Sequence, residues 1–434
     1  MMSSFLHNRL NSLSPEESLK RAASSRNRVN NLALLPPYEA TAILTPHLKE
    51  IFVPQHETQQ LLEHCFGESR AYSSMKYATE QMFRAKIYAP IKVEPVFPIC
   101  LTGLAGVGKA KFRDLLINSY PAPEEYYAGG SLSHLISTPV WYIDMLGKQS
   151  TLQALDEFLD KKKMRTDQAL NLCRKKAYIQ GVTLLIVDEI QFTTTGDGNV
   201  RLAQILLDLD SLGIPMIYMS NYSAIHKLSA RHQEERQRIF DKTSIILADS
   251  RESKYWTDYL QACLNTGNLQ IDMPFSLFSE MTYEYTWGIR RLVISLISAA
   301  YLQSRLSQRE KINISDLQTA YTSPAYGSNR KDVTDLFGQN INGEVKNRPD
   351  LSCPLCIQPA RARALAESVE RIRLEHTNRS ALLSSLSKSE RAVLKEIGLP
   401  LGPTGPAPAA PTKRPKPATK ENLLAGMRAF MNRK

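Results

Sequence analysis

Apolar positions along the chain fall into five short unbroken runs, separated by stretches with helical periodicity. The runs cover residues 96–102, 139–145, 182–188, 214–220 and 244–248. Runs of this length without polar alternation are typical of strands buried on both faces, as in a parallel sheet. The pattern therefore predicts an α/β fold in which helices cover both sides of a five-stranded parallel sheet.

Beyond residue 254 the periodicity becomes helical. We expect helices at 255–264, 275–283, 288–304 and 314–321, which would form a small all-helical lid. Residues 326–350 are polar without a clear period, and we expect them to be irregular.

The remaining segments differ in composition. Residues 40–89 have a helical pattern, with expected breaks at Pro46 and Pro54, and an arm with one short helix precedes them. The predicted organisation is an N-terminal arm at 1–39, an α/β core at 40–250, the lid at 251–330, a helical C-terminal extension at 331–399 and a proline-rich basic tail at 400–434.

The tail ends in a predicted amphipathic helix at 421–432, with Leu423, Met427 and Phe430 on one face. The proline-rich segment before it is expected to be an extended, semi-rigid tether. A short helix on a tether can dock on a partner or fold back on its own chain, and the sequence leaves both open.

The net charge of the chain predicts a polyanionic partner. The 434 residues carry a formal net charge of +11, which favours nucleic acid. Six sparse cysteines indicate reduced thiols, and Cys353 and Cys356 have zinc-ligand spacing without a second pair. No apolar run reaches the roughly 18 residues of a membrane helix, so we expect a cytoplasmic protein with no membrane partner.

The first chemical motif follows the first predicted strand. Residues 103–109 read Gly-Leu-Ala-Gly-Val-Gly-Lys, the P-loop pattern in a strand-to-helix context. Glycines let backbone N–H groups converge on phosphate oxygens at a helix N-terminus, and the lysine reaches the terminal phosphates. We assign triphosphate binding to Gly103, Gly106, Val107, Gly108, Lys109, Ala110 and Lys111.

The second motif is the apolar strand that ends in Asp188 and Glu189. Both motifs lie at the carboxyl ends of parallel strands, so they should meet at one edge of the sheet. We expect Asp188 to orient Mg²⁺ and Glu189 to polarise the attacking water. Ala110 stands where a P-loop normally has a Ser or Thr hydroxyl for the metal, so we expect slow hydrolysis.

Other polar residues follow the later strands. Asn221 is expected to orient water at the γ-phosphate. Arg236 and Arg238 belong to an arginine-rich stretch that would reach a neighbouring subunit's γ-phosphate, although a solvated helix face is the alternative. Arg290 and Arg291 begin a lid helix and would touch the nucleotide from above.

A basic segment lies between the second and third predicted strands. Charge runs are usually solvated faces, but this one also suits a DNA backbone, and salt-dependent binding would separate the two. The candidate DNA contacts are Lys161, Lys162, Lys163 and Arg165.

The order of these motifs resembles that of the AAA+ ATPases: P-loop, Asp-Glu strand, strand-end Asn, arginine cluster and helical lid. Within that superfamily the chain is most similar to the TnsC/TniB transposition regulators, including those of CRISPR-associated transposons. This similarity rests on residues 52–56 (Phe-Val-Pro-Gln-His), 187–191 (Val-Asp-Glu-Ile-Gln) and 213–221 (Gly-Ile-Pro-Met-Ile-Tyr-Met-Ser-Asn), and it spans about residues 40–325.

The resemblance implies an AAA+ P-loop NTPase core that uses ATP and Mg²⁺. It also implies a homo-oligomeric ring or filament on double-stranded DNA, which links a target selector of the TniQ/TnsD type to transposase subunits. ATP hydrolysis would control assembly. Two alternatives stay open: a DNA scaffold that binds ATP with little hydrolysis, and a helicase-loader or origin-binding ATPase.

Overall fold

The computed structural model divides the chain into two compact units, Met1–Ala362 and Arg363–Lys434. The described residues all belong to the first unit: 10–11, 13–24, 28–79, 81, 83, 87, 93–94, 96–126, 135–159, 164–193, 198–342 and 348–355. The predicted amphipathic helix, the tail, Cys356 and the lysines at 161–163 lie outside these residues.

A five-stranded, fully parallel sheet forms the centre of this unit, in the order β4-β5-β6-β1-β7. All five predicted strands are confirmed, although their ends shift by a few residues. The strands are β1 (Ile99–Gly103), β4 (Val140–Asp144), β5 (Leu184–Asp188), β6 (Met216–Ser220) and β7 (Lys242–Ile246).

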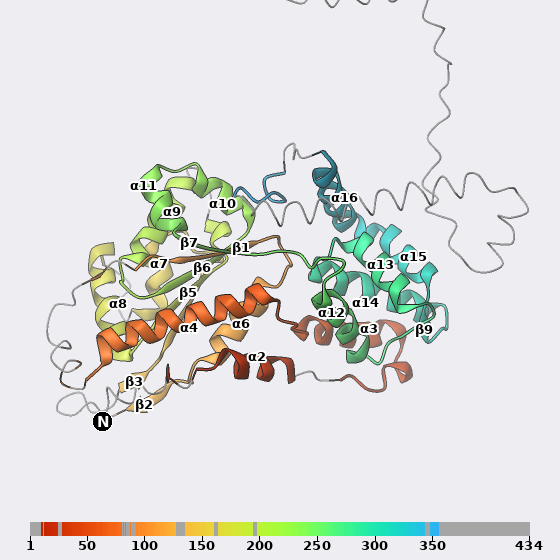
Figure 1. Cartoon of the computed structure of the whole chain (residues 1–434), viewed down its shortest axis with the longest axis horizontal. Coiled ribbons are helices and arrows are strands. Elements are labelled where there is room, and N and C mark those ends of the chain that lie inside the picture. Colours follow the sequence, from red (N-terminus) through yellow and green to blue (C-terminus); the bar gives the residue numbers. More distant parts are fainter. Residues whose placement is uncertain are drawn as a thin grey trace, which may run out of the picture. The chain divides into compact units, whose positions relative to one another are not determined.

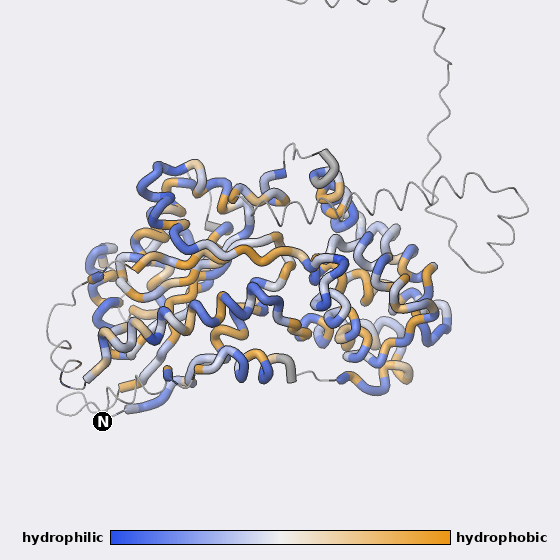
Figure 2. The backbone as a smooth tube through the Cα atoms, in the orientation of Figure 1, coloured by the Kyte–Doolittle hydropathy of each residue, from blue (hydrophilic) through white to orange (hydrophobic). Residues whose placement is uncertain are grey.

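Helices cover both faces of the sheet, as the apolar runs require. Figure 1 shows α9, α10 and α11 on one side of the strands and α4 and α6 on the other. The strands are among the most hydrophobic segments in Figure 2, because β1, β5 and β6 are buried along their whole length. The helices around the sheet are α4 (His56–Tyr77), α6 (Lys109–Ser119), α7 (Thr151–Leu155), α8 (Thr166–Gln180), α9 (Gly198–Asp210), α10 (Tyr222–Ser229) and α11 (Gln233–Phe240).

A separate group of helices forms the predicted lid (Figure 1). Its members are α12 (Lys254–Thr266), α13 (Phe275–Thr286), α14 (Arg290–Leu306) and α15 (Ile314–Thr322), with the two-residue strands β8 (Gln270–Ile271) and β9 (Lys311–Ile312).

The helix α3 (Pro37–Glu50) lies among the lid helices although it precedes the sheet in sequence (Figure 1). The Thr45 hydroxyl donates to the Ser298 hydroxyl of α14 at 3.0 Å. Leu44 and Leu48 of α3 are fully buried. The N-terminal segment therefore supplies one wall of the space next to α14.

Two expectations about helices were wrong, one about a break at Pro46 and one about an irregular segment after residue 326. Pro46 does not break the chain, since α3 continues through it. The proline lies exposed in the last part of the helix, where its missing N–H removes only one backbone bond. Residues expected to be irregular form the helix α16 (Gly327–Asn342), because Val333 and Leu336 are buried and Phe337 packs edge-on against Trp287.

Smaller elements complete the described unit. The arm contains the expected short helix, α2 (Pro15–Ser24), and an antiparallel pair joins β2 (Glu124–Tyr126) to β3 (Leu135–Ser137). Single 3-10 turns lie at Leu32–Leu34, Asp156–Phe158, Ile190–Thr193 and Pro324–Tyr326. Among the described residues, none of the helices has the length and hydropathy required to span a bilayer.

Candidate nucleotide-binding site

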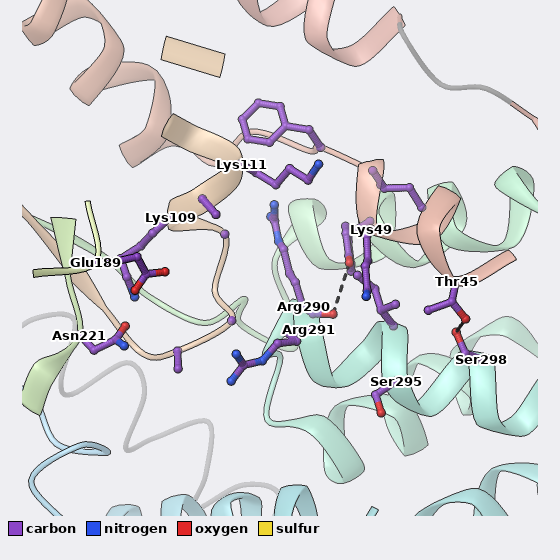
Figure 3. A pocket seen from close by; sticks show the side chains of 18 of the residues that line it. Thr45, Lys49, Lys109, Lys111, Glu189, Asn221, Arg290, Arg291, Ser295 and Ser298 are labelled. Atoms are coloured by element: carbon purple, nitrogen blue, oxygen red, sulfur yellow. Dashed lines mark hydrogen bonds between the residues drawn. The ribbon is translucent and has the colours of Figure 1, made fainter. Parts of the chain in front are cut away.

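A cavity of about 730 Å³ lies where the carboxyl ends of the strands meet the lid. Figure 3 shows Lys109, Glu189 and Asn221 at one end and Thr45, Ser295 and Ser298 at the other. The volume falls in the range of small-molecule sites. The cavity is lined by Thr41, Thr45, Lys49, Ile51, Phe52, Ala105, Gly106, Gly108, Lys109, Ala110, Lys111, Asp188, Glu189, Gln191, Ser220, Asn221, Tyr259, Arg290, Arg291, Ile294, Ser295, Ser298, Ala299 and Leu302.

The glycine turn is built as the P-loop pattern requires. Gly106 and Gly108 have φ of +91° and +117°, which side chains rarely tolerate, and α6 begins directly after Gly108. A Cβ on Gly103 would lie 2.4 Å from the Ile246 carbonyl of β7. Of the residues predicted to bind triphosphate, Gly103 and Val107 are buried and do not line the cavity. They support the loop through their packing.

The ammonium of Lys109 is held against the loop. Its Nζ donates to the carbonyls of Gly103 and Leu104, both at 2.8 Å. Burial, with a smaller contribution from nearby Arg291, lowers the pKa of Lys109 to about 7, although the charges of Asp188 and Glu189 oppose the shift. A polyphosphate at this position would therefore meet the lysine and the free N–H groups at the start of α6 together.

The acidic pair lies beside the loop. Asp188 ends β5, and its Oδ1 accepts the backbone N–H of Glu189 at 2.8 Å. Glu189 has φ of +56°, a strained value for a side chain of its size that turns the backbone sharply after the strand. Burial, followed by the charge of Asp188, raises the pKa of Glu189, and the Gln191 side-chain amide donates to its carboxylate.

Arg113, which no sequence motif indicates, contacts Asp188 beside the cavity without lining it. Its Nη1 donates to Asp188 Oδ2 at 2.8 Å, and its Nε and Nη2 donate to Asp114 Oδ1 at 3.0 and 2.8 Å. Burial opposes the charged form, but these hydrogen bonds outweigh it and raise the pKa of the Arg113 guanidinium. The available signal was spacing, because a residue four positions after Lys109 lies on the same face of a helix.

The residues present do not fit a Mg²⁺ ion bound in the usual P-loop manner. Ala110 offers a methyl group where the metal would find a hydroxyl oxygen. Each carboxylate oxygen of Asp188 already accepts a hydrogen bond, one of them from a cation. Among the described residues, no group of three or more His, Cys, Asp or Glu side chains could hold a metal ion.

Polar groups from β6 complete the end near the acidic pair. Asn221 lines the cavity and makes no capping bond to α10 through its side chain. The Ser220 hydroxyl is buried, and no described residue bonds to it. Unpaired buried polar atoms are costly, so the Ser220 hydroxyl favours a polar ligand in this cavity.

The two lid arginines differ in what they contact. The Arg290 guanidinium donates to Asp249 at 2.7 and 3.1 Å and to the Val53 carbonyl at 2.7 Å, all of them buried contacts. Arg291 is exposed toward the cavity, and its backbone N–H donates to the Gly106 carbonyl at 3.1 Å. Both arginines line the cavity, but the Arg290 guanidinium is already engaged by Asp249 and Val53, whereas the Arg291 side chain is exposed.

Apolar side chains also line the cavity. They are Ile51 and Phe52, which follow α3, and Ile294, Ala299 and Leu302 of α14. A slot with aliphatic walls beside a phosphate-binding loop suits a purine base. Sequence reasoning missed this wall, because only the fold brings α3 to α14.

Three predicted arginines lie elsewhere. Arg238 donates to Asp210 of α9 at 2.8 Å, and exposed Arg236 forms no side-chain ion pair with any described residue. Neither lines the cavity of its own chain. Arg165 is 80% exposed and lies 3.2 Å from Asp167 at the start of α8.

Comparisons with known proteins give only distant likenesses. No protein-family model matches the chain, and no curated protein sequence does. Among solved structures, Cdc6p from Pyrobaculum aerophilum is similar at 14% identity, with 73% of this chain and 81% of that one covered and a TM-score of 0.41. The Orc1 protein of Aeropyrum pernix in complex with DNA is similar at 13% identity, with 76% of this chain and 87% of that one covered and a TM-score of 0.40. The Thermotoga maritima RuvB Holliday junction branch migration motor is similar at 14% identity, with 68% of this chain and 78% of that one covered and a TM-score of 0.36.

The class of protein follows from the fold and the loop geometry. The strand carrying the glycine turn, β1, lies between β6 and the last strand β7, and the acidic pair follows the strand beyond β6. A helical lid is hydrogen-bonded to the glycine turn. The chain is therefore an α/β protein with a five-stranded parallel sheet, a P-loop turn between β1 and α6 and a helical lid, the fold class that the sequence predicts.

Proposed function

We propose that this chain binds and hydrolyses ATP and assembles on double-stranded DNA. The observation that carries the proposal is the convergence of Lys109, Glu189 and Asn221 at one end of a cavity (Figure 3) whose lining also includes the apolar slot of Ile51, Phe52 and α14. The loop and the lysine would bind the phosphates, and the slot would take the adenine.

Hydrolysis would use the acidic end of the cavity. Glu189 would accept a proton from water attacking the γ-phosphate, and Asn221 would orient that water. Arg291 would contact the phosphates from the lid. Arg236 or Arg238 would act on the γ-phosphate of a neighbouring subunit, since neither lines the cavity of its own chain.

The DNA and partner proposals rest on charge and resemblance. A net charge of +11, with Arg165 and the lysines at 161–163 as candidate contacts, favours a polyanion. Similarity to the TnsC/TniB regulators suggests a ring or filament that links a target selector to transposase subunits. In this function, ATP hydrolysis would release the assembly from DNA.

Electron microscopy of the full chain with ATP, Mg²⁺ and duplex DNA tests this proposal. Regular rings or filaments along the duplex are expected, and a Lys109→Ala variant should form none. Filter binding at low and high salt measures the DNA contacts, with affinity falling as salt rises. No DNA binding at low salt would contradict the DNA proposal.

A second candidate is an ATP-dependent scaffold with little hydrolysis, which Ala110 favours. Phosphate release with and without duplex DNA separates it from the hydrolytic switch. Glu189→Gln should stop release in the switch and hardly change it in the scaffold. A helicase-loader or origin-binding role is the remaining alternative, and it would show as binding to a replicative helicase rather than to a transposase.

A further inference from the structure

A cation already lies beside the strand-end carboxylate. Arg113 stands three residues after Ala110 on α6, so both face the same side of the helix. The Arg113 guanidinium does not line the cavity, but its Nη1 donates to Oδ2 of Asp188, which does, at 2.8 Å. Ala110, which lacks the usual hydroxyl, and Arg113, which adds a cation, are therefore both near Asp188.

Arg113 is held firmly in this position. Asp114 accepts from its Nε and Nη2 at 3.0 and 2.8 Å, and the centre of its guanidinium lies 5.5 Å from the Tyr142 ring centroid. The side chains of Arg113 and Asp188 are only 23% and 9% exposed. A planar guanidinium fixed by two carboxylates and an aromatic ring is preorganised and always charged.

This arrangement changes the electrostatics that normally attract a divalent ion. The guanidinium neutralises the Asp188 charge and would repel a second cation at short range. The other Asp188 oxygen accepts from the Glu189 backbone, so it is also engaged. Lys109 and Arg291, near the same cavity, supply further positive charge for a phosphate chain.

We propose that the Arg113 guanidinium takes the place of the divalent cation beside Asp188, so that this chain binds nucleoside triphosphate without Mg²⁺. The inference rests on the proposed nucleotide function of the cavity. It assigns to the protein a charge that P-loop proteins normally take from the metal.

Fluorescence titration of the full chain with N-methylanthraniloyl-ATP, in EDTA and in excess Mg²⁺, tests the proposal. For the natural chain we expect Kd values within about threefold of each other. For Arg113→Ala we expect Kd in EDTA to rise about tenfold or more above its value in Mg²⁺. If Arg113→Ala does not fold, Arg113→Gln keeps donors for Asp188 without the charge and should gain the same Mg²⁺ dependence.

Two results would overturn the proposal. One is a natural chain whose affinity falls more than about threefold in EDTA; the other is equal Mg²⁺ dependence in the natural chain and the Arg113 variants. Lys109→Ala separates this failure from failure of the proposed function. If that variant binds as tightly as the natural chain, the cavity is not the nucleotide site; if it loses binding while the natural chain needs Mg²⁺, only the Arg113 inference fails.

Discussion

The backbone N–H of Arg291 donates to the carbonyl of Gly106 at 3.1 Å, which ties the first turn of the lid helix α14 to the P-loop. The contact is close, since a Cβ on Gly106 would lie 2.7 Å from the Arg291 Cβ and 3.0 Å from its Nε. A second tie lies nearby, where the Asp249 N–H donates to the Gly288 carbonyl at 3.1 Å. A ligand that moves the loop must therefore also move the start of α14.

Gly106→Ala tests this tie. The new methyl group would meet Arg291 in a backbone conformation with φ of +91°, so strain and a clash act together. We expect the free energy of unfolding to fall by about 1–3 kcal/mol and nucleotide affinity to fall by about tenfold or more. Chemical denaturation and nucleotide titration measure the two effects.

Gly108→Ala is the matched control, because its φ of +117° is also strained but nothing lies within 4 Å of the added Cβ. Gly67→Ala in α4 meets neither strain nor neighbours and should stabilise the helix by about 0.5–1 kcal/mol. Equal losses in Gly106→Ala and Gly108→Ala would show that the contact with Arg291 contributes nothing.

Alanine substitutions of the neighbouring residues Arg290 and Arg291 should affect different properties, the first mainly stability and the second mainly nucleotide affinity. Arg290→Ala leaves the Asp249 carboxylate buried at 3% exposure without its cation, which should lower the free energy of unfolding by about 3–5 kcal/mol. Arg291→Ala removes an exposed side chain from the cavity and should mainly weaken nucleotide binding, by about tenfold. Thermal unfolding and nucleotide titration of both variants give the comparison, and a large stability loss in Arg291→Ala would refute it.

The sequence was sufficient for the central sheet and for both halves of the site. Leu184–Asp188 and Met216–Ser220 are buried at every position, so unbroken apolar runs identify them. Their carboxyl ends converge in any parallel sheet, which is why Lys109 and Glu189 could be expected together. The edge strand Lys242–Ile246 was placed two residues late, because it is only partly buried and begins with a lysine paired to a glutamate.

The hydrophobic pattern of the sequence could not predict contacts between segments that lie far apart in the chain. In the sequence, Arg113 has the pattern of an ordinary cation on a helix surface, and only the fold brings Asp188 of β5 against it. The α3 wall of the cavity depends on packing against a helix about 250 positions later in the chain, as in the bond from Thr45 to Ser298. Hydrophobic periodicity reports that a face is buried, but it does not report which segment covers it.

Nucleotide affinity should depend on pH through Lys109. Its pKa is lowered from 10.5 to about 7, mainly by burial, whereas a bound polyphosphate favours the charged ammonium. Binding should therefore take up protons, and affinity should fall as pH rises above about 7, by up to about tenfold per pH unit. The charged groups that face this lysine are Asp188, Glu189 and Arg291.

Titration of the nucleotide affinity between about pH 7.5 and 9 measures this effect, with Lys109→Arg as the control because its guanidinium stays charged throughout. The free chain should show the linked change in stability. A depressed lysine pKa means that the unfolded chain binds more protons between about pH 7 and 10.5, so the free energy of unfolding should rise with pH across that window. A pH-independent affinity in the natural chain would contradict the low pKa of Lys109.

Arg238 and Arg236 differ in what they contact, so their alanine variants should differ in stability. Arg238 pairs with Asp210, which is 5% exposed and has a second oxygen with no partner among the described residues. Because the arginine is 49% exposed, we expect Arg238→Ala to cost only about 1 kcal/mol of unfolding free energy. Arg236→Ala should leave stability unchanged, since this exposed side chain has no ion pair with a described residue.

If Arg236 completes a neighbouring subunit's site, Arg236→Ala should lower phosphate release by the DNA-bound assembly by about 10³-fold. Mixing then gives a sharper test. A Glu189→Gln subunit retains Arg236, and an Arg236→Ala subunit retains Glu189, so mixed assemblies contain some complete sites although each variant alone has none. Release should recover on mixing the two inactive variants. No recovery would mean that Arg236 does not act across the subunit boundary, because complementation requires each residue to come from a different chain.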